Sequence, residues 1–234
     1  MQSSNNLKSK TISSLVWKLL ERGGNQIVQL VVQVVMARLL APEQFGALAI
    51  ILVFVNLGNV FVQSGLNTAL VQNQSCDDAD CSTVFWMSFS ISVVLVIVIF
   101  LSAPTVSVFY DIPELEWPLR AMSLMFVVNS FNAVQVAIVQ RALEFKKVFN
   151  ATIVSVLISG VIGIGFALMG AGLWALVFQQ LCYQIANCAV LALQVRWAPR
   201  FVFSVARAKI LFSFGSCLFQ ARSIRDIKVY LILL

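Results

Sequence analysis

A file of polar side chains runs through the first long apolar stretch of the sequence and carries its most distinctive chemistry. It starts at the adjacent pair Glu21 and Arg22 and continues from Glu21 at four-residue steps through Asn25, Gln29 and Gln33. Such steps place side chains on one face of a helix. Charged and amide groups at membrane depth are costly, so they usually face a partner helix or an interior cavity. The guanidinium of Arg22 suits an anionic group such as a phosphate, and it suits Glu21 almost as well.

Three further apolar stretches carry amides along one helix face. The stripes are Asn56, Asn59, Gln63 and Asn67; Asn129, Asn132 and Gln135; and Gln180, Gln184 and Asn187. A hydrogen bond between helices, worth about 0.6 kcal/mol, explains any one of them. Four stripes together favour a hydrated central cavity. We expect its lining to include Arg22, Glu21, Asn25, Gln29, Asn56, Asn59, Gln63, Asn132, Gln180 and Gln184.

The composition places these stripes in a membrane protein. Of the 234 residues, 60% are hydrophobic and 11% are charged, whereas soluble domains carry about 25% charge. The apolar runs are long and nearly continuous, which predicts an all-α polytopic bundle rather than a barrel. The net charge is +6, but the basic residues lie in short segments between apolar runs, so they are read as topology signals and no nucleic-acid partner is expected. Histidine is absent, which weakens every enzyme hypothesis; no catalytic residue and no cofactor is predicted.

The lengths of the apolar runs and the residues that flank them predict six complete membrane spans. They lie at about residues 14–40, 47–71, 83–103, 119–140, 149–169 and 173–195. Residues 42–46 are expected to turn the chain, Pro104 to close the third span, and residues 170–172 to form a tight turn. The chain then divides into a cytoplasmic tail (1–13), a six-helix lobe (14–209) and a partial seventh helix with an atypical tail (210–234). Because Arg222, Arg225, Asp226 and Lys228 crowd that tail, truncation is the expectation here.

The basic residues also predict the orientation of the bundle. With the N-terminus inside, nine bases fall on inner segments and two on outer ones. The nine are Lys8, Lys10, Arg141, Lys146, Lys147, Arg196, Arg200, Arg207 and Lys209, and the two are Arg38 and Arg120. The positive-inside rule therefore predicts a cytoplasmic N-terminus.

One acidic segment, expected to be a loop at residues 73–82, suggests a metal site. Cys76 and Cys81 flank Asp77, Asp78 and Asp80. Since no further pair of metal-binding residues follows, the match is weak and no metal is predicted.

Five stretches resemble the Wzx-type polysaccharide flippases, relatives of the lipid II flippases and of MATE-type exporters. They read MARLLAPEQFGALAI (36–50), VQSGLNTALVQ (62–72), VQRALEFKKVFN (139–150), GAGLWALVFQQL (170–181) and RWAPRFVF (196–203). The resemblance implies translocation of an undecaprenyl-pyrophosphate-linked oligosaccharide across the bacterial inner membrane, between two pseudo-symmetric helix lobes. Such transporters carry twelve or more helices, so the chain resembles the N-terminal lobe alone.

The partners implied by this resemblance are a lipid-linked oligosaccharide, membrane lipids, polysaccharide polymerase or glycosyltransferase machinery, and a C-terminal lobe missing from this chain. Three alternatives remain open. A cation-coupled exporter would use Glu21 as its membrane carboxylate. A membrane-embedded glycosyl-transferring enzyme would need the acidic cluster at residues 77–80. A non-functional flippase fragment would explain the atypical tail.

Overall fold

The structure, a computed structural model, describes residues 23, 26–63, 78–142, 144–195 and 197–199. An apolar helix, Gln26–Leu39, comes first. It is followed by α2 (Pro42–Gln63), α4 (Asp78–Phe109), the short 3₁₀ helix η1 (Pro113–Leu115), α5 (Glu116–Ser123), α6 (Met125–Arg141), α7 (Phe145–Leu168) and α8 (Leu173–Val195). No strand occurs in this part of the chain. The predicted all-α class is therefore confirmed.

Five helical segments within the described ranges are long and apolar enough to cross a membrane. They are Pro42–Val60, Asp80–Phe109, Pro113–Arg141, Phe145–Leu168 and Leu173–Val195. The first predicted span lies partly outside the described residues, and the apolar run predicted from residue 210 lies wholly outside them.

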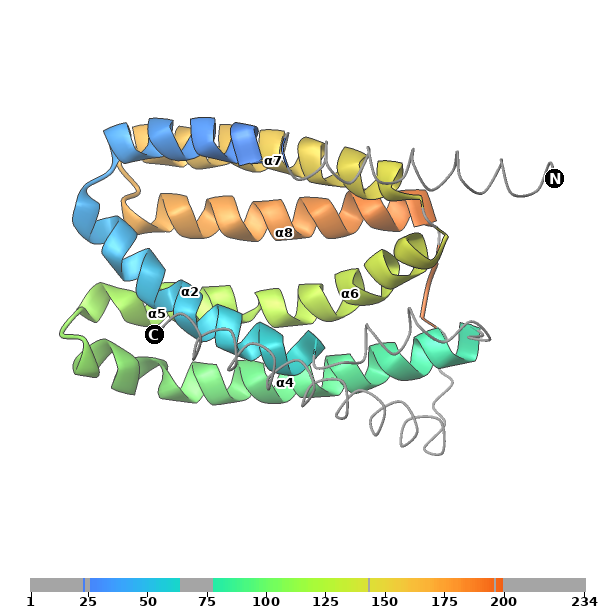
Figure 1. The fold of residues 1–234 in the computed structure, drawn as a ribbon. Coiled ribbons are helices and arrows are strands. Elements are labelled where there is room, and N and C mark those ends of the chain that lie inside the picture. Colours follow the sequence, from blue (N-terminus) through green and yellow to red (C-terminus); the bar gives the residue numbers. More distant parts are fainter. Residues whose placement is uncertain (1–22, 24–25, 64–77, 143, 196, 200–234) are drawn as a thin grey trace, which may run out of the picture.

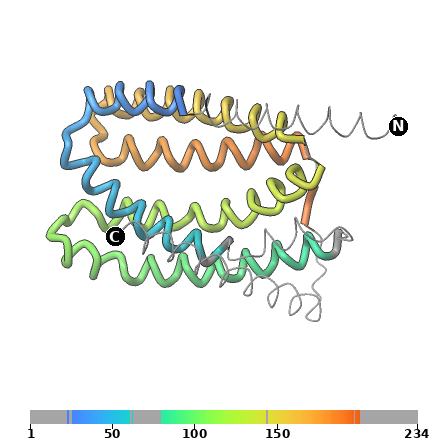
Figure 2. Tube along the Cα trace, viewed as in Figure 1, coloured from blue at the N-terminus to red at the C-terminus, as the bar shows by residue number. Residues whose placement is uncertain are grey.

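The long helices pack side by side in an order that differs from their order in the sequence. α7 packs on α8, α8 on α6, and α6 on α4, as the stacked ribbons of Figure 1 show. The tube in Figure 2 shows α2 running obliquely across the middle of the stack, where it contacts α4, α6 and α8. This placement brings three amide-bearing helices, α2, α6 and α8, against one another.

The chain turns alternately at two ends of the bundle (Figure 2). We call the end with the α6–α7 connector, residues 141–145, the connector end. We call the opposite end, with residues 109–116 and 168–173, the turn end. The predicted tight turn at residues 170–172 is confirmed, because Gly170 and Gly172 have φ angles of 77° and 58°.

Two helices finish at the turn end with the same hydrogen-bond pattern. After α7, Gly170 N donates to Ala167 O at 3.0 Å and Ala171 N donates to Phe166 O at 3.1 Å. After α4, Asp111 N donates to Val108 O and Ile112 N donates to Ser107 O. Both are Schellman motifs, in which a residue with positive φ lets the chain leave the helix. At α4 that residue is Asp111, with φ 55°.

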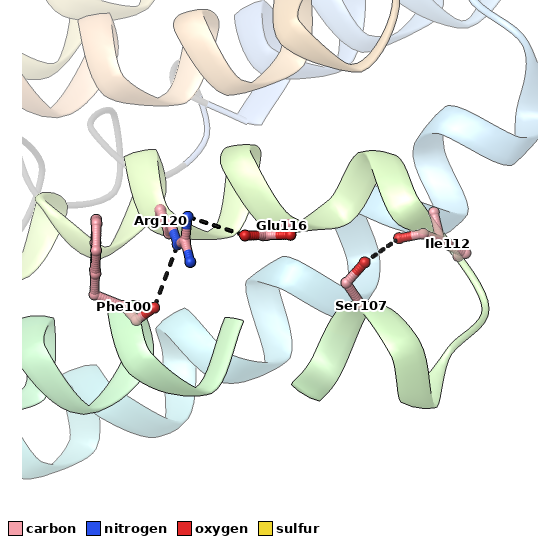
Figure 3. A network of polar contacts seen from close by, with 5 residues as sticks. All are labelled: Phe100, Ser107, Ile112, Glu116 and Arg120. Atoms are coloured by element: carbon pink, nitrogen blue, oxygen red, sulfur yellow. Dashed lines mark hydrogen bonds and ion pairs between the residues drawn. The ribbon is translucent and has the colours of Figure 1, made fainter. Parts of the chain in front are cut away.

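The prediction that Pro104 closes the third span is wrong, because α4 continues through Pro104 to Phe109. Proline has no N–H, so the carbonyl four residues earlier loses its helical partner. That carbonyl belongs to Phe100, and Arg120 of α5 supplies the missing donor through Nε at 3.3 Å (Figure 3). The helix therefore loses no carbonyl hydrogen bond at this point.

Other boundaries also differ from the prediction. Residues 42–46 do not turn the chain; α2 begins at Pro42, a favourable first helical position for proline. The acidic segment predicted as a loop up to residue 82 is helical from Asp78 onward, and Asp80 and Cys81 are buried there. The fourth predicted span lies within one membrane-length segment, Pro113–Arg141, in which the single residue Leu124 separates α5 from α6.

Side-chain size explains how the helices approach one another. A main apolar core gathers Met36, Ile51, Leu119, Phe126 and Leu176, all nearly or fully buried. Small residues at the α7 interface, Ser155, Ser159, Gly160 and Gly163, are all buried and let the helices approach closely. In contrast, the aliphatic stretch of α4 exposes Val94, Ile97, Val98 and Leu101, as expected of a helix surface that faces lipid.

Candidate functional site

Three amides from three helices form a hydrogen-bonded chain inside the bundle, here called the amide chain. Asn129 on α6 is its centre, and Asn129 Nδ2 donates to Asn59 Oδ1 on α2 at 2.7 Å. Gln184 Nε2 on α8 donates to Asn129 Oδ1. Each residue therefore uses an amide atom across a helix interface. The amide chain carries no net charge, so it offers donors and acceptors without attracting ions.

Two further amides lie on the following turns of α6 without hydrogen-bond partners. The side chain of Gln135 is fully buried, and neither its Oε1 nor its Nε2 has a partner. Asn132 Oδ1 is also buried and unpartnered, although the residue as a whole is half-buried. Because Asn132 and Gln135 are three residues apart, they lie on neighbouring positions of one helix surface.

Buried serines near these amides are satisfied within their own helices. Ser130 Oγ on α6 donates to Val127 O at 2.8 Å, and Ser92 Oγ on α4 donates to Ser88 O at 2.7 Å. Such bonds leave no donor pointing to another group. The unpartnered atoms of Asn132 and Gln135 therefore differ in kind from the serine hydroxyls around them.

The structure separates the predicted cavity residues into distinct groups. Asn59 and Gln184 take part in the amide chain, and Asn132 lies next to it on α6. Gln180 and Gln29 are half-buried, whereas Asn56 is exposed on α2. The remaining candidates lie outside the described residues or have side chains outside them: Glu21, Arg22, Asn25 and Gln63.

The predicted list of cavity residues left out the two amides that the structure makes most informative. Asn129 joins the other two helices, and Gln135 is fully buried. Both belong to the stripe that the i, i+3 spacing had already indicated. Their separate roles depend on which neighbouring helix each one meets, and the sequence contains no signal for that.

Only part of the acidic cluster that was considered as a metal site lies within the described residues. Asp80 and Cys81 lie buried in the first turns of α4, while Cys76 and Asp77 lie outside the described residues. Among the described residues, no group of three potential metal ligands comes together.

At the turn end, a second polar cluster surrounds Arg120. Its Nη1 lies 2.9 Å from Glu116 Oε1, one turn earlier on α5, and Figure 3 shows this pair beside the Phe100 carbonyl. The guanidinium also lies over the rings of Phe100 and Trp117, at 4.6 and 5.0 Å from their centroids. Arg120 thus joins α5 to α4 through Phe100, so we assign this cluster a structural role.

A bundle of apolar, membrane-length helices with neutral amides joined across its interior defines a multi-pass membrane protein. The chain belongs to the polysaccharide biosynthesis protein family, whose sequence profile matches residues 35–229. This match confirms the resemblance to polysaccharide flippases seen in the sequence.

Curated relatives carry names of the same kind. The succinoglycan biosynthesis transport protein ExoT of Rhizobium meliloti is 31% identical over 89% of this chain and 43% of its own length. The lipopolysaccharide biosynthesis protein WzxC of Escherichia coli is 25% identical over 84% of this chain and 39% of its own length. The teichuronic acid biosynthesis protein TuaB of Bacillus subtilis is 26% identical over 70% of this chain and 34% of its own length.

The chain thus spans less than half the length of these curated relatives. No solved structure matches it. The relatives are named for the transport or the biosynthesis of polysaccharides.

Proposed function

We propose that this chain forms one lobe of a flippase that moves a lipid-linked oligosaccharide from the cytoplasmic to the outer leaflet of a bacterial inner membrane. The observation that carries the proposal is an interior of neutral amides in a chain of the polysaccharide biosynthesis family. A glycan is dense in hydroxyl groups, and each hydroxyl both donates and accepts hydrogen bonds. Amide side chains match that chemistry.

The lipid carrier places a second demand on the protein. In undecaprenyl pyrophosphate, two phosphate groups carry negative charge, and neutral amides cannot neutralise it. We assign that task to Arg22, whose planar guanidinium binds phosphate oxygens through paired donors. Arg22 lies outside the described residues, so its role is argued from its position in the first polar file.

Alternating access requires two bodies that move against each other around one binding site. The relatives are more than twice as long as the region they share with this chain. We therefore propose that a second helix lobe completes the pathway, and that the transporter works beside polysaccharide polymerase or glycosyltransferase machinery. The orientation follows the basic residues, which puts the N-terminus and the connector end, with Lys146 and Lys147, in the cytoplasm.

The test is to reconstitute the 234-residue chain in liposomes containing undecaprenyl pyrophosphate that carries a fluorescent neutral tetrasaccharide. Flipping is measured as protection of the fluorophore from an impermeant quencher, and binding is measured by titrating the same glycolipid onto the chain in detergent. Saturable binding or flipping above that of protein-free liposomes is expected. A chain that neither binds nor flips the glycolipid contradicts the proposal.

The role of Arg22 has its own control. We expect Arg22→Ala to lose binding of both the glycolipid and bare undecaprenyl pyrophosphate, while Arg22→Lys retains part of it because the charge remains. Membrane insertion of both variants is checked by their yield and helical content. Unchanged affinity in Arg22→Ala would remove Arg22 from the proposal and leave the amides as its basis.

A further inference from the structure

The buried amides of α6 differ in whether their hydrogen-bonding groups are used. Asn129 forms hydrogen bonds across two helix interfaces, to Asn59 and to Gln184. Gln135, six residues further along α6, is fully buried with both amide atoms unpartnered. Asn132 between them has one unpartnered buried oxygen. The same stripe therefore contains amides that join helices and amide atoms that bond to none of the described residues.

An unpartnered buried amide is a cost to the folded state. Leaving a buried donor or acceptor unsatisfied costs about 1–3 kcal/mol for each group. One turn further along α6 from Gln135, Val139 is buried and apolar, as are Val134 and Ala137 in the same stretch of the helix. A leucine or methionine at position 135 would avoid this cost. Packing alone therefore does not explain an amide at this position.

The chemistry of these atoms restricts what they recognise. Gln135 offers two N–H donors and a carbonyl acceptor, and Asn132 adds an acceptor, all without charge. Phosphate groups need cationic donors to balance their charge, so they fit poorly here. A hydroxyl group both donates and accepts, and two hydroxyls on adjacent carbons of a sugar ring can engage both ends of one amide.

We propose that Gln135 and Asn132 form a subsite for the hydroxyl-bearing, uncharged sugar part of the cargo, distinct from the amide chain. This inference rests on the proposed function. Asn132 is half-buried and Gln135 is fully buried, so Asn132 lies on the access side and Gln135 lies deeper. The amide chain holds the three helices in register, and Asn132 and Gln135 bind the sugar.

The deciding variant is Gln135→Met, which keeps the length of the side chain and removes its polar atoms. Its affinity is measured for two probes: undecaprenyl pyrophosphate carrying a neutral tetrasaccharide, and undecaprenyl pyrophosphate alone. We expect about tenfold weaker binding of the glycolipid, unchanged binding of the bare carrier, and a melting temperature equal to or above that of the parent. Gln135→Leu repeats the test if the methionine variant fails to fold.

The matched control is Ser130→Ala, which removes a buried polar group from the same helix. Since the Ser130 hydroxyl is satisfied by the Val127 carbonyl, we expect its affinity for both probes to match the parent. If the Gln135 variants bind only the glycolipid more weakly, Gln135 contacts the sugar rather than water.

Two outcomes would overturn the subsite while leaving the proposed function in place. Unchanged affinity for both probes, with a parent that binds the glycolipid, would show that Gln135 meets only water. Equal weakening of both probes would show a general structural defect. A parent chain that binds neither probe would overturn the proposed function and the subsite with it.

Discussion

Arg120 Nε donates a hydrogen bond to the carbonyl oxygen of Phe100 at 3.3 Å. That carbonyl is the one that Pro104 leaves without a helical partner. A side chain from the next helix thus replaces a backbone donor, and Glu116 fixes the guanidinium from the other side at 2.9 Å. In hydrocarbon, where water is absent, such replacement is what allows proline inside a membrane helix.

Arg120→Ala should therefore destabilise the protein, because it uncovers the Phe100 carbonyl. A hydrogen bond from a charged donor is worth about 1.5–3 kcal/mol. In a Pro104→Ala background the new N–H can bond to the same carbonyl, so the cost of Arg120→Ala should fall by about 1 kcal/mol. Thermal unfolding of the parent, both single variants and the double variant in detergent measures this coupling.

Glu116→Gln serves as the control for that experiment. It removes the ion pair at Arg120 but leaves the donor to Phe100 in place, so its effect should not depend on residue 104. If Arg120→Ala costs the same with proline and with alanine at position 104, the carbonyl bond contributes nothing to stability.

The amide chain gives a second prediction. Asn129 bonds to Asn59, so Asn129→Leu and Asn59→Leu should be non-additive. Hydrogen bonds between membrane helices average about 0.6 kcal/mol and reach about 1.7 kcal/mol. We expect a coupling free energy in that range from a double-mutant cycle. As the matched control, Asn129 and the exposed Asn56 should show none, and equal coupling in both cycles would contradict the pairing.

Much of the fold follows from the sequence because span length and apolar content act locally. The predicted sixth span has the same bounds as α8, and the glycine turn before it forms as expected. The continuation of α4 through Pro104 could not be predicted, because it depends on a donor sixteen residues further along the chain.

In the candidate site, too, the sequence predicted the features that depend on a single helix and not those that depend on several. Spacing of three and four residues identified the polar faces of α2, α6 and α8, since that pattern depends on one helix alone. It could not show that Asn129 would bond to two other helices while Gln135 would remain unpartnered. That difference depends on how the helices are rotated against one another, which many weak apolar contacts decide together.

Close packing of α7 on α8 leads to a third prediction. A Cβ added at Gly163 would come 2.9 Å from Cβ and Cγ of Gln179, closer than the two helices can allow without shifting. Gly163→Ala should therefore destabilise the protein by about 1–3 kcal/mol. Gly165→Ala is the matched control on the same helix, because nothing lies within 4 Å of its added Cβ. It should be neutral or gain up to about 1 kcal/mol. Similar melting temperatures for the two variants would contradict this packing.

At the two Schellman turns, we expect Gly170→Ala and Asp111→Gly to change stability in opposite directions. Gly170 has φ 77° and open space around its Cα, so Gly170→Ala should destabilise the protein through backbone strain alone, by about 1–2 kcal/mol. Asp111 already carries that strain at φ 55°, so Asp111→Gly should stabilise it by up to about 1 kcal/mol. Chemical or thermal unfolding of both variants measures the difference. If both substitutions moved stability in the same direction, side-chain contacts rather than backbone conformation would govern these turns.

The charge of the Asp111 carboxylate is tested separately with Asp111→Asn. This substitution removes the charge and keeps a residue that tolerates positive φ. The stability of the variant should remain close to that of the parent.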